Sequence, residues 1–328
     1  MRMRTLLAQI LALATFANEE AGAQKRNLIF VSNEASKSIT VLDTRSTWRQ
    51  TIPVGSRPRG IAVSPDGKLV YVALSDEVPL KESAGDRIAV IDVASGRVIR
   101  QHSSGSDPEQ FGVTPDGRIL YASNEDAGTA SAIDLRTGKV LATVVVGIEP
   151  EGVAISPDGR WAYVTAETSN SVSVIDTRTN KVVSSFLVDV RPRAAVFSPD
   201  GRRAYVSAEL GGSINVVDAT QHRVLSTIQL ERGEGKPVGV AISSDGRWLY
   251  VANGRTSNVS VIDLRRSAVA ATIPVGRRPW GIALSRDGRE LYTANGLSND
   301  VSVIDVSSRK VVRTIRVGQR PWGVATAR

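Results

Sequence analysis

Short apolar or alternating segments recur along the chain, and each is ended by a turn. In one example, residues 152–156 are apolar, and Pro157-Asp158-Gly159 predicts a tight turn because proline fixes φ and glycine accepts a positive φ. Residues 161–165 predict a second strand, and residues 171–176 alternate polar and apolar side chains as a third. After the turn at residues 177–180, residues 181–188 predict a fourth strand. The pattern therefore predicts units of four short antiparallel strands.

The unit returns seven times with a period near 42 residues. Its first marker is a proline that opens each unit, at Pro58, Pro108, Pro150, Pro192, Pro237, Pro279 and Pro321. Its second marker is an aspartate after a branched residue, at Asp43, Asp92, Asp134, Asp176, Asp218, Asp263 and Asp305. Seven equivalent copies favour a turn-forming role for these aspartates over a catalytic one. Four strands repeated at this period are typical of a β-propeller.

The two ends of the repeated region complement each other. Residues 28–32 form the second strand of a unit that lacks its first strand, and residues 322–326 form a first strand that lacks the rest. Pairing them would close the ring and remove its exposed edges. The sequence thus predicts an all-β fold, a seven-bladed β-propeller with four antiparallel strands per blade, closed by the C-terminal strand.

The first residues do not fit the repeat. Arg2 and Arg4 precede an apolar run over residues 6–17, and Ala21-Gly22-Ala23 supplies the small residues that a signal peptidase requires. We expect residues 1–23 to be a cleaved signal peptide and residues 24–328 to be a single propeller domain, periplasmic or secreted. The apolar run is too short to span a bilayer, and no other stretch is long enough.

Composition excludes several kinds of site. The chain has no cysteine, which rules out disulfides, thiolate metal sites and covalently attached haem. No Ser/His/Asp set, phosphate loop or zinc spacing is present. The net charge of +8 comes from Lys and Arg scattered over turns, without the basic stripe and interleaved aromatics that nucleic-acid binding would need. We therefore expect neither a nucleic-acid partner nor catalytic residues of a familiar kind.

The residues beside the seven prolines vary in chemistry although the repeat around them is monotonous. We expect these positions to lie together at one mouth of the ring and to bind a ligand or a partner. The predicted mouth residues are Arg57, Arg59, Asp107, Glu109, Glu149, Glu151, Arg191, Arg193, Arg278, Trp280, Arg320 and Trp322. The ends of the second strands add carboxylates at Glu34, Asp76, Glu125, Glu167 and Glu209.

Two further features concern this face. Its loops hold both large insertions, near residues 77–86 and 231–236, and loop variation on a rigid scaffold is where binding commonly occurs. Arginines suit an anionic group and tryptophans a flat one, so a small anionic ligand fits such a mouth. A cation held by Asp107, Glu109, Glu149 and Glu151 is an alternative. The plainer alternative is that the charges form salt bridges between blades and that Trp280 and Trp322 fill space.

Several phrases resemble known propellers. Tyr163-Val164-Thr165-Ala166 and Tyr250-Val251-Ala252-Asn253 are similar to the namesake phrase of the YVTN repeat family. Residues 107–109, 149–152, 191–193 and 295–305 resemble the β-propeller family associated with catabolism that depends on pyrroloquinoline quinone (PQQ). That resemblance implies a periplasmic accessory role beside a PQQ-dependent dehydrogenase and an ABC transporter, with PQQ as a candidate ligand. It implies no catalytic residue and no metal site.

Three functions are therefore open from the sequence. The first is a non-enzymatic binding or accessory propeller that serves a PQQ-dependent alcohol oxidation system. The second is an enzyme of the lactonase or hydrolase kind, with the acidic residues of the third and fourth repeats as its only candidate acid/base pair. The third is a surface scaffold, or a DNA-binding protein of the YVTN type. Fold alone does not separate them.

Overall fold

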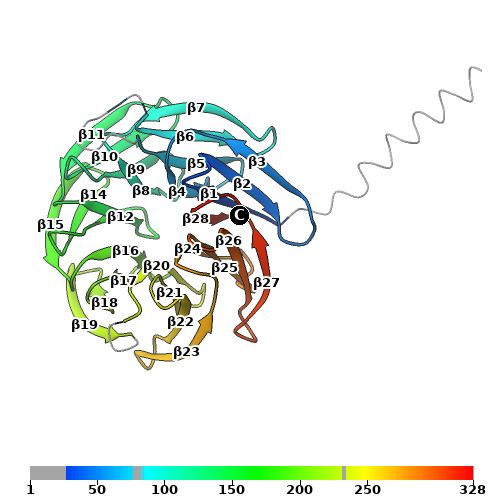
Figure 1. Ribbon diagram of the computed structural model, residues 1–328. Coiled ribbons are helices and arrows are strands. Elements are labelled where there is room, and N and C mark those ends of the chain that lie inside the picture. The colour runs from blue at the N-terminus through cyan, green and yellow to red at the C-terminus, as the bar shows by residue number, and fades with distance from the viewer. Residues whose placement is uncertain (1–26, 77–82, 84, 231–233, 328) are drawn as a thin grey trace, which may run out of the picture.

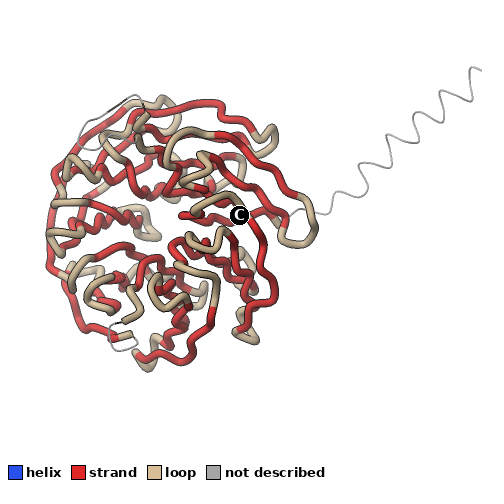
Figure 2. The backbone as a smooth tube through the Cα atoms, viewed as in Figure 1, coloured by secondary structure: helices blue, strands red, loops and turns tan. Residues whose placement is uncertain are grey.

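Seven four-stranded sheets stand around a central axis like the blades of a propeller (Figures 1 and 2). This computed structural model describes residues 27–76, 83, 85–230 and 234–327. Every strand pairs with its neighbours in antiparallel fashion, as in β13 with β14, where Tyr163 lies opposite Val174. Within the described residues the secondary structure is entirely strands and turns, so the predicted all-β, seven-bladed architecture is confirmed.

The strands follow one another from the axis outward in each blade. Blade one contains β28 (Pro321–Thr326), β1 (Leu28–Asn33), β2 (Ser38–Asp43) and β3 (Arg49–Pro53). Blade two contains β4 (Pro58–Val63), β5 (Leu69–Leu74), β6 (Arg87–Asp92) and β7 (Arg97–Ser103). Blade three contains β8 (Pro108–Val113), β9 (Ile119–Asn124), β10 (Thr129–Asp134) and β11 (Val140–Val145). Blade four contains β12 (Pro150–Ile155), β13 (Trp161–Ala166), β14 (Ser171–Asp176) and β15 (Lys181–Leu187).

The remaining blades repeat this order. Blade five contains β16 (Pro192–Phe197), β17 (Arg203–Ala208), β18 (Ser213–Asp218) and β19 (Arg223–Gln229). Blade six contains β20 (Pro237–Ile242), β21 (Trp248–Asn253), β22 (Asn258–Asp263) and β23 (Ala268–Pro274). Blade seven contains β24 (Pro279–Leu284), β25 (Glu290–Asn295), β26 (Asp300–Asp305) and β27 (Lys310–Arg316). All seven anchoring prolines therefore begin an innermost strand.

Blade one is built from both ends of the described chain. The C-terminal strand β28 pairs with β1, placing Ala325 opposite Phe30 and Val324 opposite Val31. Phe30 and Val31 are fully buried by this pairing. The closure expected from the two incomplete repeats is confirmed, and β28 covers the inner edge of β1, which would otherwise be unpaired.

The hydrophobic core lies between blades rather than at the axis. One cluster joins Tyr121 and Ala130 of blade three to Val164 and Ile175 of blade four, and six comparable clusters fill the other wedges. Close approach near the axis requires small residues. A Cβ at Gly152 would lie 2.3 Å from the carbonyl oxygen of Arg193 in the next innermost strand. Glycine there allows adjacent blades to converge.

The turns on one face form as the sequence predicts. In the first of them, the Ser64 hydroxyl donates to Asp66 at 2.6 Å, and Gly67 adopts a φ of 74°. The repeated aspartates at the ends of the third strands also cap turns, as where Asp134 accepts the backbone N–H of Thr137 at 2.7 Å. Their structural role is confirmed. The predicted signal peptide, most of the first insertion and half of the second lie outside the described residues.

Candidate functional site

The seven residues that precede the anchoring prolines share an unusual backbone conformation. Each has a positive φ, between 39° and 61°, at Arg57, Asp107, Glu149, Arg191, Lys236, Arg278 and Arg320. Glycine or asparagine normally occupies this left-handed region, so a charged residue there is uncommon. The same conformation occurs at other turns, for example at Lys37 and Arg309, so here it reflects the repeated turn that leads into each innermost strand.

A repeated hydrogen bond brings these residues to the ends of the second strands. The carbonyl oxygen of Asp107 accepts the N–H of Glu125 at 3.1 Å, and that of Arg191 accepts the N–H of Glu209 at 2.7 Å. The carbonyl of Arg320 accepts the N–H of Glu34 in the same way. The carboxylates that end the second strands are thereby placed beside the proline-flanking ring, as the sequence suggested.

The residues that follow the prolines are held from the preceding blade. The Ser123 hydroxyl donates to the carbonyl of Glu151 at 2.6 Å, and the Thr165 hydroxyl donates to the carbonyl of Arg193 at 3.2 Å. The Ser32 hydroxyl donates to the carbonyl of Arg59 at 2.6 Å. A buried hydroxyl on the second strand of one blade therefore fixes the backbone that carries a mouth side chain on the next.

The mouth holds a cavity of about 480 Å³. From the predicted set, it is lined by Arg59, Glu109, Glu151, Arg191, Arg193, Arg278, Trp280, Arg320 and Trp322. It is also lined by Glu34, Glu125, Gly296, Leu297 and Pro321, which were not among the predicted site residues. Glu34 and Glu125 had a signal in the sequence, since both end second strands. Leu297 and Gly296 had none, because only the folded ring places the turn between β25 and β26 at the mouth.

Three predicted residues do not line the cavity. Arg57 and Asp107 lie behind its wall, where Arg57 Nη1 is 3.4 Å from Asp107 Oδ1. Glu149 lines a separate groove between blades four and five and accepts a hydrogen bond from the Thr168 hydroxyl. The sequence placed these residues correctly at the mouth face, but it could not show which of two adjacent surfaces each side chain would face.

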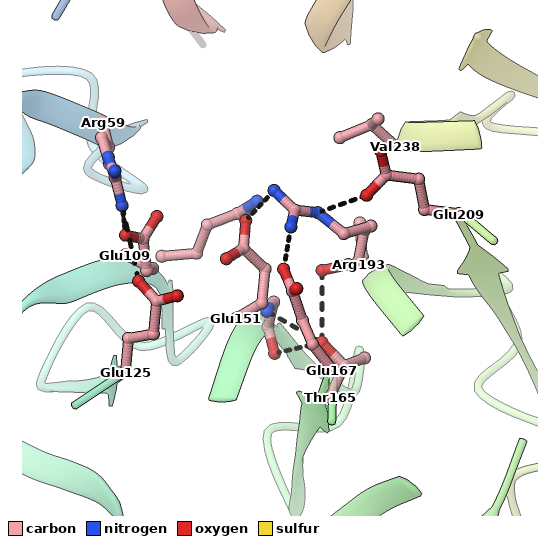
Figure 3. A network of polar contacts seen from close by, with 12 residues as sticks. Arg59, Glu109, Glu125, Glu151, Thr165, Glu167, Arg193, Glu209 and Val238 are labelled. Carbon is pink, nitrogen blue, oxygen red and sulfur yellow. Dashed lines mark hydrogen bonds and ion pairs between the residues drawn. The ribbon is translucent and has the colours of Figure 1, made fainter. Parts of the chain in front are cut away.

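One wall of the cavity is a buried ion cluster around Arg193, shown in Figure 3. The three guanidinium nitrogens of Arg193 face three carboxylates, with Glu151 at 3.0 Å from Nη2, Glu209 at 3.8 Å from Nε and Glu167 against Nη1. Arg191 adds a second guanidinium, 2.6 Å from Glu167 and 3.4 Å from Glu209. We call these five residues the Arg193 cluster. Arg193 is only 6% exposed, so its carboxylate partners replace water.

A second cluster surrounds Arg59 on blades one to three. The Nη1 atom of Arg59 contacts Glu109 and lies 3.7 Å from Glu125 (Figure 3). The Nε atom of Arg59 lies 3.3 Å from Glu34. Arg57 extends the network to Asp107 and Glu34. We call these residues, Arg57, Arg59, Glu34, Asp107, Glu109 and Glu125, the Arg59 cluster. The expectation of interblade salt bridges is thus met at both clusters.

Another part of the cavity lining is aromatic and basic, and it adjoins the Arg193 cluster, since the Arg193 guanidinium lies 5.2 Å from the centre of the Trp280 ring. Trp280 of blade seven and Trp322 of blade one stack with ring centroids 6.2 Å apart. The Arg278 guanidinium lies over the Trp280 ring at 4.6 Å, and among the described residues no carboxylate lies within 4 Å of it. Arg320 is more exposed, with its Nε 4.0 Å from Glu34. The cavity is therefore polarised, with carboxylates on blades three and four and indoles on blades seven and one.

Two cavity carboxyls have shifted acidities. Burial raises the pKa of Glu125, an effect that Asp107 and Asp126 add to and that Arg59 opposes. Burial also raises the pKa of Glu151, against the influence of Arg193 and Arg59. Glu125 keeps 28% of its side chain exposed in the cavity, whereas Glu151 is almost fully buried. Glu125 is therefore the carboxyl that combines raised basicity with access to a ligand.

The carboxylates do not group as the cation alternative required. Oxygens of Asp107, Glu109 and Glu125 lie within 4.8 Å of one another, whereas Glu149 and Glu151 are not part of this group. The proposed four-residue set is therefore wrong. Arg59 contacts Glu109 and lies beside Glu125, and this guanidinium already supplies the positive charge that a metal ion would bring.

No helix in the described part of the chain could cross a membrane.

Two family models match the sequence. The "Choice-of-anchor I domain" model matches residues 15–188, and the "Lactonase, 7-bladed beta-propeller" model matches residues 188–314. No curated protein sequence matches the chain. None of these findings links the chain to PQQ.

Solved structures share the fold at low sequence identity. The periplasmic gluconolactonase of Pseudomonas aeruginosa is 22% identical over 92% of this chain and 99% of its own, with a TM-score of 0.76. The hydrazine synthase of Kuenenia stuttgartiensis is 24% identical over 86% of this chain and 93% of its own, also with a TM-score of 0.76. A protein of unknown function from Desulfotomaculum acetoxidans is 20% identical over 92% of this chain and 99% of its own, with a TM-score of 0.79. The chain belongs to the choice-of-anchor I domain family, and it is a seven-bladed β-propeller of the lactonase, YVTN-like kind.

Proposed function

We propose that this protein hydrolyses a small polar lactone, such as the lactone of a sugar acid, in the mouth cavity. The observation that carries the proposal is the accessible carboxyl of Glu125, whose pKa is raised, in a cavity whose other wall holds Arg278 without a carboxylate partner. The lactonase family match and the likeness to a gluconolactonase support the choice of reaction by analogy of fold. The residues of the cavity supply the chemistry.

Glu125 acts as the general base. Its carboxylate takes a proton from a water molecule, and the resulting hydroxide attacks the lactone carbonyl carbon. The ring C–O bond then breaks, and the proton held by Glu125 passes to the alkoxide that leaves. The product is an open-chain hydroxy acid, which ionises in solution. A raised pKa makes Glu125 a stronger base than an ordinary glutamate, provided that the pH lies above that pKa.

Arg278 and the tryptophans bind the substrate. The guanidinium of Arg278 stabilises the negative charge that develops on the carbonyl oxygen during attack, because no carboxylate among the described residues already neutralises it. The stacked indoles of Trp280 and Trp322 offer a flat apolar surface to one face of the lactone ring. The cavity of about 480 Å³ is large enough for a single sugar-sized ring.

The direct test is hydrolysis of glucono-δ-lactone, followed by titration of the acid released. We expect the purified protein to accelerate hydrolysis above the spontaneous rate, and Glu125→Gln to lower kcat by at least about 100-fold. Glu149→Gln is the matched control, because Glu149 lies on the same face but in a separate groove. Failure of the protein to hydrolyse glucono-δ-lactone and a panel of other uncharged lactones would refute the proposal.

An accessory binding role is the second candidate. The observation that favours it is the commitment of the mouth's buried arginines to carboxylates within the protein, which suits a rigid docking surface as well as an active site. The expected partners are a PQQ-dependent dehydrogenase or a transporter component in the periplasm. Co-purification of a PQQ-dependent dehydrogenase with the native protein, together with absence of lactone hydrolysis, would favour this candidate over the first.

A further inference from the structure

The buried arginines of the mouth already face carboxylates of the protein itself. In the Arg193 cluster, each of the three guanidinium nitrogens faces a different carboxylate. In the Arg59 cluster, Nε faces Glu34 and Nη1 faces both Glu109 and Glu125. A phosphate or carboxylate is normally recognised through paired N–H groups of such a fork. Here all three Arg193 nitrogens, and the Nε and Nη1 of Arg59, already lie within 4.0 Å of a carboxylate, although Arg193 Nε makes no hydrogen bond.

Both clusters contain more carboxylates than guanidinium groups. The Arg193 cluster has three carboxylates and two guanidinium groups, and the Arg59 cluster has four and two. Four of these carboxylates, Glu34, Glu109, Glu125 and Glu151, line the cavity itself. An incoming anion would therefore meet negative charge at short range.

The aromatic wall does not reverse this balance. Arg278 and Arg320 are the cavity-lining cations outside the two clusters. Arg320 has 66% of its side chain exposed and lies near Glu34, so solvent and that carboxylate weaken its field. Arg278 remains as the one well-placed cation among the described lining residues. It can stabilise a single developing charge, but it cannot balance a phosphate dianion against both carboxylate-rich clusters.

We propose, building on the lactonase function above, that this mouth selects lactones that carry no phosphate or other strongly anionic group, and that Glu167 and Glu209 determine this selectivity. Both glutamates contact Arg191 and Arg193 from the side away from the cavity lining. They hold these two arginines in ion pairs. The two guanidinium groups are therefore kept from binding a phosphate together in the cavity. The substrate is an uncharged polyhydroxy lactone.

The test compares two substrates that differ by one phosphoryl group. The ratio of kcat/KM for glucono-δ-lactone to that for 6-phosphoglucono-δ-lactone is expected to exceed about 10, because like charges brought together at a binding site oppose association. Glu209→Gln removes one charge while keeping the shape of the side chain, and it should shift this ratio at least about fivefold toward the phosphorylated lactone. Glu149→Gln removes one charge from the same face outside the cavity and should leave the ratio within about twofold, because solvent screens exposed charges.

Binding measurements separate this proposal from the proposed reaction. Calorimetric titration with gluconate and with 6-phosphogluconate reports charge selection whether or not the protein hydrolyses lactones. Stronger binding of gluconate supports the proposal, and equal or stronger binding of 6-phosphogluconate by the wild-type protein overturns it. If no lactone is hydrolysed but gluconate is preferred, the reaction is wrong and the charge selectivity holds. Thermal unfolding verifies that Glu209→Gln is folded. If this variant is not folded, the binding of gluconate and 6-phosphogluconate by the wild-type protein still tests the proposal.

Discussion

Trp280 and Trp322 stack across the boundary between blades seven and one, with their ring planes only 16° from parallel. The two indoles are not equivalent. Trp322 lies in the C-terminal strand β28 and is 8% exposed, whereas Trp280 is only partly buried and lies beneath the Arg278 guanidinium. One ring therefore belongs more to the packing of the closing strand, and the other more to the cavity.

This difference predicts that the two alanine substitutions mainly affect different properties, stability for Trp322 and ligand affinity for Trp280. Trp322→Ala should lower the free energy of unfolding by about 3–5 kcal/mol, the range for a buried aromatic residue. Trp280→Ala should cost less stability and weaken the affinity for a sugar-acid ligand by about tenfold. Urea unfolding and calorimetric titration measure the two quantities. If both variants lose stability and neither loses affinity, the tryptophans only fill the wedge between blades.

The C-terminal strand should be essential to the whole ring. Deletion of residues 321–328 removes β28, and with it the pairing to β1 and the buried Trp322, Val324 and Ala325. We expect the free energy of unfolding to fall by about 5 kcal/mol, since each large apolar side chain contributes roughly 1.5–3 kcal/mol. Deletion of residues 327–328 alone leaves β28 intact and serves as the control. A thermal unfolding midpoint unchanged by the longer deletion would contradict closure through this strand.

The fold could be predicted because its information is local and repeated. Each proline opens an innermost strand, and each Pro-Asp-Gly phrase or its variant forms a turn, so one well-understood unit such as β12 to β15 specifies the other six. The closure could also be predicted, because β1 to β3 lack an innermost strand of their own and β28 supplies one. Even the convergence at the axis was encoded, in glycines such as Gly152.

The site was only partly predictable, because its properties depend on distances between blades. The repeat placed Arg193 and Glu151 at equivalent positions, but it could not show that Arg193 reaches back to Glu167 and across to Glu209. The sequence alone predicts that these arginines bind an anion, whereas the structure places Arg59 and Arg193 in ion pairs with glutamates. Glu149 and Glu151 are two residues apart, yet one lines an outer groove and the other the cavity, because Glu149 precedes β12 with a positive φ of 56°, whereas Glu151 lies within the strand.

Export of the protein is a separate prediction that lies outside the described residues. The basic start, the apolar run and Ala21-Gly22-Ala23 predict removal of residues 1–23 in the native host. Mass spectrometry of the native protein should give a chain that starts at or near Gln24, recovered outside the cytoplasm. Substitution of Ala23 by arginine should block cleavage and leave the longer chain. An intact N-terminus on the wild-type protein would contradict the signal.

The acidity of Glu125 gives a prediction with two independent readouts. Since burial raises its pKa above the ordinary value of 4.5, lactone hydrolysis should fall on acidification with a midpoint above 4.5, and Glu125→Gln should abolish that limb. Stability should respond with a definite sign. Between the pKa of the unfolded chain and the higher pKa of the folded protein, only the unfolded state has released its proton, so the free energy of unfolding falls as pH rises through this window.

Glu125→Gln should therefore be more stable relative to the wild-type protein at pH 7 than at pH 4, as measured by urea unfolding. Asp305 provides the opposite case on the far face of the ring. Hydrogen bonds from Ser307 and Ser308 lower the pKa of Asp305 to about 2, so its contribution is present above the ordinary value of 3.8 and is lost as pH falls toward 2. Asp305→Asn should thus lose stability relative to the wild-type protein at pH 7 and recover parity in acid. Parallel pH profiles for the two variants would show that the environment of Glu125 does not raise its pKa.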